Sequence, residues 1–250
     1  MLGTGTSHGV PVLGCNCKTC LSDDPRDFRT RSSVYLQTNN RHIIIDTATE
    51  FRLQTLKNKV PRVDLVLFTH KHADHISGFD DLRRFNQLQA GLIPVYGNGD
   101  TIESIKCMFP YIFDDTVQEG GGKPQIGLNE INQPFSANEV EIIPIPVFHG
   151  QMRIFGYRIG DFAYITDCSL IPAESLSLLK NLKLLVLGVL RYRAHPTHFN
   201  LETGLEVISL LRPERCYLTH LAHDFQHEEV NKILPENVEL GYDGLRIEIL

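Results

Sequence analysis

The chain has 250 residues, 42% of them hydrophobic and 22% charged, and its formal net charge is -6. This composition is that of a globular protein, and an α/β protein of this length can be a single domain, which we predict for residues 1–250. The negative charge argues against broad electrostatic binding to nucleic acids or to anionic membranes. We find no 18-residue apolar run and no signal peptide, so we expect a cytoplasmic protein without a membrane partner.

The chain opens with a loop of glycine and hydroxyl residues, from Gly3 to Ser7. Its backbone amides could face an anion, and a plain tight turn explains the same pattern about equally well. Thr6 and Ser7 are the candidate substrate contacts in this loop.

Three cysteines follow within six residues, and we call them the cysteine clip (Cys15, Cys17 and Cys20). In a reducing compartment such spacing is a metal site far more often than a disulfide, because thiolates bind zinc tetrahedrally. A structural zinc at residues 15–20 needs a fourth ligand, and none lies nearby in the sequence. The other cysteines stand among apolar neighbours, so we predict small core residues at Cys107, Cys168 and Cys216.

Residues 34–37 and 42–45 predict a β-hairpin that turns at Asn39 and Asn40 and ends in Asp46. We expect the Asp46 carboxylate to hydrogen-bond a metal-binding histidine. Capping of a helix over 47–57 is an equally good explanation of this aspartate.

The apolar run 63–68 predicts a buried strand, and Thr-His-Lys-His-Ala-Asp-His follows it at 69–75. Beyond this motif, apolar residues at helical spacing predict a helix over 79–89. In an extended segment His70 and His72 can point the same way, whereas Asp74 and His75 turn toward a second position. Imidazole and carboxylate suit zinc, manganese or iron, so the motif predicts two adjacent metal ions.

Three later apolar runs, over 140–147, 162–165 and 216–218, each end shortly before a residue that can bind a metal. Those residues are His149, Asp167 and His220. As isolated residues, they could equally be satisfied polar groups at strand ends.

A further buried strand over 182–190 leads into a polar segment that contains Arg191, His195 and His198. An amphipathic helix over 201–211 is expected to follow it. Arg191 could hold a phosphate, although a solvated arginine is the default.

The motif H-x-H-x-D-H, here His70, His72, Asp74 and His75, resembles the signature of the metallo-β-lactamase superfamily. The resemblance to this superfamily extends along essentially the whole chain. The resemblance implies an α/β fold, an αβ/βα sandwich of two mixed sheets flanked by helices. The cysteine clip after a G-T-G-T-S-x-G-V-P opening is similar to the branch that contains phosphoribosyl 1,2-cyclic phosphate phosphodiesterase.

This resemblance also implies a role for each candidate residue. One active-site ion, zinc or manganese, would be bound by His70, His72 and His149, and the other by Asp74, His75 and His220. Asp167 would bridge both ions, and His223 would complete the structural zinc site of the cysteine clip. Catalytic roles fall to Asp74, Asp167 and His198, with His198 as general acid and His195 as its competitor.

We therefore expect a metal-dependent phosphodiesterase that hydrolyses a small, cyclic, ribose-type phosphodiester through a hydroxide bridging two metal ions. Relatives in this branch suggest a homodimer. One alternative is a transfer-RNA 3′-processing endonuclease of the RNase Z kind. Only eighteen positions separate His149 from Asp167, which leaves no room for an RNA-binding arm, and Phe199-Asn200-Leu201 replaces that family's Glu-Ala-Thr. The other alternative is a non-catalytic or cofactor-biosynthesis protein of the same fold.

Overall fold

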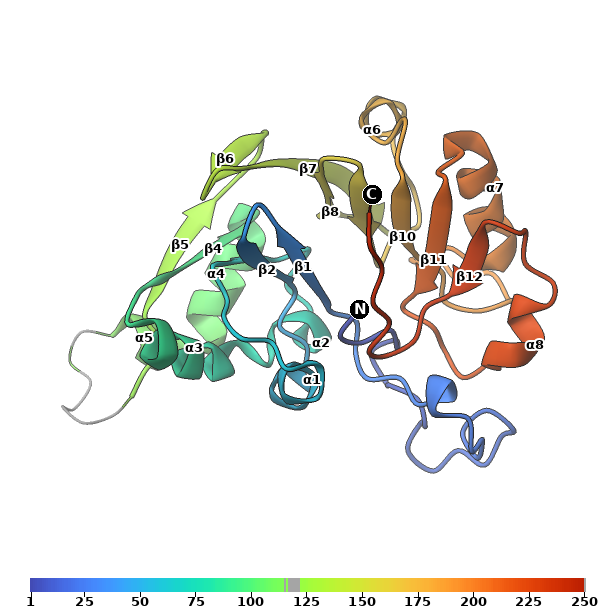
Figure 1. The fold of residues 1–250 in the computed structure, drawn as a ribbon, viewed down its shortest axis with the longest axis horizontal. Helices are drawn as coiled ribbons and strands as arrows, with labels where there is room; N and C mark the ends of the chain where they lie inside the picture. The colour runs from blue at the N-terminus through green and yellow to red at the C-terminus, as the bar shows by residue number, and fades with distance from the viewer. Residues whose placement is uncertain (115, 117–121, 250) are drawn as a thin grey trace.

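A computed structural model of the chain describes residues 1–114, 116 and 122–249, which form two β-sheets with helices on their outer faces (Figure 1). Within these residues the first sheet has the strand order β1-β2-β3-β4-β5. The strands are β1 (Val34–Thr38), β2 (Arg41–Ile45), β3 (Leu65–Leu67), β4 (Ile93–Gly97) and β5 (Ile126–Glu130). Strands β1 and β2 are antiparallel, and the other neighbours are parallel.

The second sheet has the order β12-β11-β10-β9-β8-β7-β6 in the described part of the chain. Its strands are β6 (Phe135–Ala137), β7 (Val140–His149), β8 (Met152–Ile159), β9 (Phe162–Ile165), β10 (Leu184–Gly188), β11 (Arg215–Thr219) and β12 (Val238–Leu240). Strands β9 to β12 run parallel, whereas β6 to β9 form antiparallel hairpins. Both sheets are therefore mixed, as predicted.

Short helices surround the sheets. Those near the first sheet are α1 (Phe51–Asn58), α2 (Ala73–Ile76), η2 (Phe79–Asp81), α3 (Leu82–Gln89), α4 (Gly99–Met108) and α5 (Pro110–Phe113), and those near the second are α6 (Ala173–Leu178), α7 (Leu201–Leu211) and α8 (His227–Asn231). A further turn of 3-10 helix, η1 (Pro25–Asp27), lies in the N-terminal segment. Among the described residues, no helix has both the length and the apolar character needed to cross a bilayer.

The central strands are buried on both faces, and alternation of their side chains explains the layers. Ile43 and Ile45 of β2 pack between the sheets with Tyr157 and Tyr164 of the second sheet. Ile44, between them in sequence, points to the opposite face and packs under the helices. Because successive residues of a strand alternate, one continuous apolar run fills two cores. The result is the αβ/βα sandwich predicted from the sequence.

The predicted hairpin of the first sheet is confirmed, and two other predictions need correction. Asn39 and Asn40 have φ angles of 48° and 58°, as a two-residue hairpin turn requires. The helix expected over 79–89 is divided into η2 and α3. Cys107 is exposed and not a core residue, because α4 turns Ile102 and Ile105 inward instead. Cys168 and Cys216 are buried, as predicted.

Candidate metal centres

The metal-binding side chains lie where strands of both sheets end. His70 follows β3, His149 is the last residue of β7, and His220 directly follows β11. Asp167 comes two residues after β9, which is parallel to β10 and, through it, to β11. Since the carboxyl ends of parallel strands meet at one edge of a sheet, residues far apart in sequence reach one site.

A first cluster consists of one imidazole each from His70, His72 and His149 and the carboxylate of Asp167. One ligand atom of each residue lies within 4.8 Å of those of the others. The Nε2 atom of His70 is 3.8 Å from Oδ2 of Asp167. This is the ligand set expected for one active-site ion, with Asp167 added.

A second cluster consists of Asp74, His75, His220 and, again, Asp167, whose ligand atoms also lie within 4.8 Å of one another. Oδ1 of Asp167 is 3.1 Å from Nε2 of His220 and 3.4 Å from Nε2 of His75. The two oxygens of Asp167 are thus divided between the clusters. Asp167 and His220 have φ angles of 51° and 58°, a conformation that non-glycine residues seldom adopt and that is frequent at functional sites.

Both clusters fit divalent cations, because they leave buried nitrogen atoms without another partner. Nε2 of His70, His75 and His220 is buried and has no hydrogen-bond partner in the described part of the chain. Leaving a buried polar atom unpaired costs about 1–3 kcal/mol. Coordination of a cation between these nitrogens and the Asp167 carboxylate would remove that cost.

Hydrogen bonds to the opposite ring nitrogen fix the orientation of three of these histidines. Nδ1 of His75 donates to Oδ2 of Asp46 at 2.7 Å. Nδ1 of His149 donates to the carbonyl oxygen of Thr197 at 2.8 Å, and Nδ1 of His70 lies 3.0 Å from Oγ1 of Thr69. Such partners select the tautomer that leaves Nε2 free for a metal.

The structure decides between the two roles that the sequence allowed for Asp46, a hydrogen bond to a ligand histidine and a helix cap. It accepts hydrogen bonds from the amide and the hydroxyl of Thr69, both at 2.8 Å, in addition to the bond from His75. The alternative, a helix cap, is wrong, since α1 begins at Phe51 and Glu50 is its N-cap residue.

The charges of the second cluster favour a positive ion. Burial alone would lower the pKa of the His75 imidazole, but nearby carboxylates, led by Asp167 and Asp46, hold that pKa well above its usual value. Burial alone would raise the pKa of Asp167, and the imidazoles of His220 and His75 reverse this and hold it well below its usual value. A metal ion bound here would therefore displace a proton from His75.

His198 lies between the two clusters. Its ring centroid is 4.6 Å from that of His149 and 5.0 Å from that of His220, on which it stacks with an interplanar angle of 16°. His195 lies one ring further out, 5.0 Å from His198. Burial lowers the pKa of His198 to about 3, so the imidazole is neutral in the free site.

The loop that carries His195 and His198 is held by its own polar groups. Arg191 donates to the carbonyl oxygens of Arg193 at 3.3 Å and Ala194 at 3.2 Å, so its guanidinium shapes this loop. The Asn200 side chain caps α7 and donates to the Tyr192 carbonyl at 3.1 Å. The loop therefore ends at Asn200, the N-cap residue of α7, two residues after His198.

The opening loop lies beside the end of β11. The amide of Thr6 donates to the Leu221 carbonyl at 3.2 Å, next to His220. The Thr6 side chain is buried, whereas Ser7 is exposed. Ser7 is therefore the more accessible of the two candidate substrate contacts.

The cysteine clip and His223 come together as the resemblance implied. Nδ1 of His223 lies 3.2 Å from Sγ of Cys15, 3.4 Å from Sγ of Cys17 and 3.5 Å from Sγ of Cys20. Three thiolates and one imidazole at mutual distances within 4.8 Å suit a tetrahedral zinc ion.

Sequence reasoning missed two contributors to these sites. Thr197 acts through its backbone carbonyl, so its side chain gives no signal. Arg29 is 1% exposed and binds carbonyl oxygens next to His223, although arginine is normally a surface residue.

Comparison with known proteins places these features in context. A family model described as the beta-lactamase superfamily domain matches residues 41–221. The structure of a diphosphatase from the PhnP family has a TM-score of 0.93 and 38% identity, covering 100% of this chain and 96% of that one. Zinc-bound PqqB from Methylobacterium extorquens has a TM-score of 0.78 at 16% identity, covering 99% and 98% of the two chains, and shows the fold alone.

Two of the curated relatives match this chain over only part of their own length. An octanoyltransferase of Porphyromonas gingivalis is 37% identical over 250 residues, which are 98% of this chain and 50% of that protein. A ribonuclease Z of Clostridium kluyveri is 28% identical over 155 residues, 61% of this chain and 42% of that protein. The chain thus spans about half the length, or less, of the curated relatives it matches.

Proposed function

Because the chain belongs to the metallo-β-lactamase superfamily, in its PhnP-like branch, we propose that it hydrolyses a small phosphodiester with two bound divalent ions. Membership in this superfamily agrees with the prediction from the sequence that the protein is a metal-dependent hydrolase. The observation that carries the proposal is the division of the two Asp167 oxygens between the clusters, with His198 stacked on His220 of one cluster and edge-on to His149 of the other.

The ligand sets assign the ions to residues. His70, His72 and His149 would hold one ion, Asp74, His75 and His220 the other, and Asp167 both. Two such ions, zinc or manganese, supply a hydroxide near neutral pH and neutralise the charge of a phosphate. The cysteine clip with His223 would hold a structural zinc.

The chain's own residues position the reacting groups. Hydrogen bonds from His75 to Asp46 and from His149 to Thr197 keep the ligand rings in place before substrate arrives. In hydrolysis, the phosphorus gains a water-derived oxygen and the bond to one ester oxygen breaks. His198 is placed to give its proton to that departing oxygen.

The protonation of His198 depends on the charges next to its ring. Its pKa of about 3 in the free site means that the ring is neutral at pH 7. An anionic phosphate next to the imidazole favours the charged form and raises that pKa. A bound phosphate next to this ring would therefore favour the form of His198 that can act as an acid.

Two observations favour a small substrate over transfer RNA. Between His149 and Asp167 the chain forms β8 and β9. A tight turn at Gly150 joins β7 to β8 and another at Gly160 joins β8 to β9, so no arm protrudes there. The net charge of -6 also disfavours a polyanion.

The relative at 38% identity is a diphosphatase, which supports chemistry at phosphorus. Because the chain matches half of the octanoyltransferase, that name alone does not support acyl transfer here.

The test compares two leaving groups. Wild type, His198→Ala and His195→Ala are assayed with ribose 1,2-cyclic phosphate and with bis(p-nitrophenyl) phosphate, and metal content is measured in parallel. Nitrophenolate leaves readily without a proton, so loss of a general acid should lower turnover of the cyclic phosphate by about 10²–10⁴-fold and affect the nitrophenyl ester much less.

Equal losses on both substrates would refute the acid role of His198, and a selective loss in His195→Ala would move that role to His195. Rapid hydrolysis of a thioester without turnover of any phosphodiester would overturn the proposed function. Specific cleavage of precursor transfer RNA would favour the endonuclease alternative. The homodimer stays a prediction, which light scattering of the purified protein tests.

A further inference from the structure

His220 differs from the other buried histidines of the two clusters. His70, His75 and His149 each have a hydrogen-bond partner at Nδ1. Both ring nitrogens of His220 are buried and without a hydrogen-bond partner among the residues that the structure describes. The position of this ring is therefore set by its backbone and by stacking on His75 and His198, and no hydrogen bond to its Nδ1 orients it.

The backbone after β11 is tied to the rest of the protein at closely spaced points. Leu221 donates its amide to the Thr4 carbonyl at 2.9 Å and accepts from the Thr6 amide at 3.2 Å. Ala222 donates to the Leu190 carbonyl at 2.9 Å. These bonds fix one side of the segment, and its other side faces the N-terminal insert (residues 11–28).

Arg29 holds that other side. Its guanidinium donates to the Ala222 carbonyl at 3.2 Å and to the Phe225 carbonyl at 2.7 Å, and it pairs with Asp27 at 3.1 Å. The side chain is completely buried. Burying a charge is expensive unless every donor finds an acceptor, so Arg29 stays buried only while residues 222–225 keep this path.

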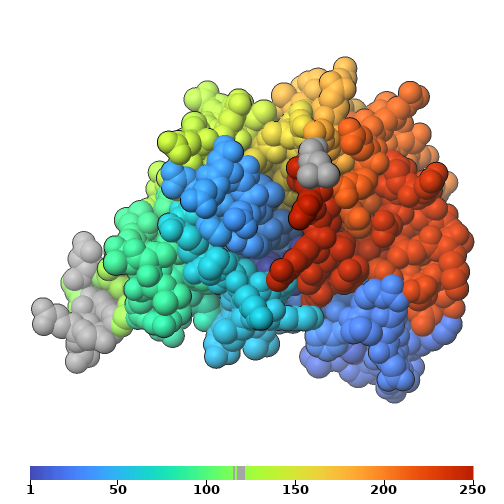
Figure 2. All heavy atoms as spheres, in the orientation of Figure 1, coloured from blue at the N-terminus to red at the C-terminus, as the bar shows by residue number. Residues whose placement is uncertain are grey.

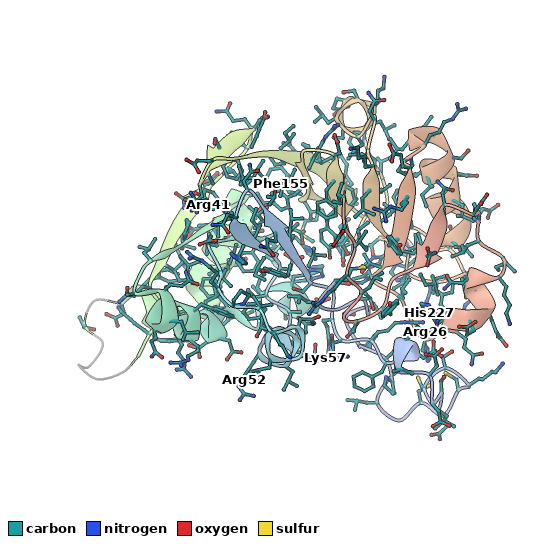
Figure 3. The ribbon with its side chains drawn as sticks, in the orientation of Figure 1. Arg26, Arg41, Arg52, Lys57, Phe155 and His227 are labelled. Carbon is teal, nitrogen blue, oxygen red and sulfur yellow. The ribbon has the colours of Figure 1, made fainter. Side chains whose placement is uncertain are left out.

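The insert is closed on itself at its base and against the segment after β11 at its tip. At its base, Val10 and Arg29 exchange backbone hydrogen bonds, both of 2.8 Å. At its tip, the cysteine clip surrounds His223, which lies between the two carbonyls that Arg29 binds. Figure 2 shows the insert packed against the C-terminal part of the chain, and Figure 3 shows Arg26 and His227 close together at that junction.

We propose that Arg29 and the cysteine clip together are positioning elements for His220, so that a metal ion in the clip increases the affinity of the second cluster for its own ion. The clip fixes His223 and Arg29 fixes the carbonyls on either side of it, three residues from His220. The first cluster has no ligand on this segment and is linked to it through the shared Asp167, so its ion should respond much less to the clip. The inference rests on the metal occupancy assumed in the proposed function, and its test does not depend on turnover.

The experiment follows metal release from the full chain loaded with cobalt(II). Thiolate-to-cobalt charge-transfer absorption reports the clip, and the weaker visible bands of cobalt bound by histidine and carboxylate report the two clusters. Asp74→Asn, which removes a ligand of the second cluster, supplies the reference spectrum and release rate of a protein without that ion. Each variant is mixed with a chelator, and the release phases are resolved in time.

In Arg29→Met we expect the second-cluster ion to leave about 10–100-fold faster, the range typical of lost outer-sphere support. The clip and first-cluster phases should keep their wild-type rates. Arg29→Lys, which keeps the positive charge and one donor nitrogen, should restore part of the slow release. His223→Ala should lose the clip ion and show the same faster phase. The matched control is Arg158→Met, because Arg158 also binds carbonyl oxygens, of Gly160, Leu178 and Lys180, far from both sites.

Wild-type release from the second cluster in both Arg29→Met and His223→Ala would overturn the proposal. Equal acceleration of both active-site phases would also overturn it, because general loosening would then be the cause. If Arg29→Met does not fold, as judged by circular dichroism, Arg29→Lys and His223→Ala decide the question by the same criteria.

Discussion

The candidate dinuclear centre collects its ligands from the ends of both sheets, whereas the cysteine clip takes three of its four ligands from six consecutive residues. Most ligands of the centre are buried, and Asp46 and Thr197 orient them. In the clip, Cys15, Cys17 and His223 are half-buried, and the insert contains one turn of helix, η1. The centre is thus a product of the whole fold, and the clip is a local structure attached to it. Substitutions in the two regions should differ in size and in kind.

Asp167→Ala should have the largest effect, because this carboxylate belongs to both clusters. We expect loss of at least one active-site ion and a decrease in kcat/KM of about a thousandfold, or about 4 kcal/mol. Metal analysis and phosphodiester turnover measure both. Asp161→Ala, an exposed aspartate of the adjoining hairpin, should behave as wild type. Retained activity in Asp167→Ala would mean that the centre does not depend on a shared ligand.

Asp46→Asn should have an intermediate effect, because it weakens the acceptor for His75 and leaves every ligand in place. Loss of such a partner typically lowers metal affinity by about 10–100-fold, which competition with a chelator measures. Asp243→Asn is the matched control. Asp243 is a half-buried aspartate that also accepts bonds from threonines, Thr4 and Thr30, and it touches neither cluster. Equal affinity losses in both variants would show that burial, and not contact with His75, is responsible.

His227→Gln should have the smallest effect on metal binding and turnover, because its consequence is confined to stability near the clip at acidic pH. Burial, together with Arg26 and Arg29, lowers the pKa of His227 to about 4. Its Nε2 accepts a bond from Asn231, as a neutral ring can. The unfolded chain therefore takes up this proton first as the pH falls. Stability from the neutral ring is complete above about pH 6.5 and is lost as the pH falls to about 4, by about 3 kcal/mol in total.

Urea unfolding of wild type and His227→Gln between pH 7 and pH 4 measures this contribution. The variant should lose less stability than wild type over that interval. Parallel curves would mean that His227 is accessible to protons in the folded state.

The same contrast explains what the sequence could predict. Apolar runs at Ile43–Ile45 and 63–68 predict buried strands, and metal-binding residues at the ends of such runs predict a common site. The Asn39-Asn40 turn is equally local. The roles of His198 and His223 depended on resemblance to a family, since no spacing links them to their neighbours in space.

What escaped prediction depends on contacts between distant segments. The carbonyl groups of Thr197 and Ala222 have no signature in a sequence, because every residue has one. Arg29 resembles any surface arginine until the chain folds around it. The exposure of Cys107 depends on which face α4 turns to the sheet, and one cysteine in a helix of ten residues does not decide that.

The clip connects Cys15 to His223, residues 208 positions apart, and all seven residues of the dinuclear centre lie between them. During synthesis the three thiolates leave the ribosome before every ligand of the dinuclear centre, and their fourth ligand leaves after all of them. His220 and His223 then emerge within three residues of each other. The structural site and the second cluster are therefore completed at the same step of synthesis, whereas the first cluster has all of its ligands once Asp167 has emerged.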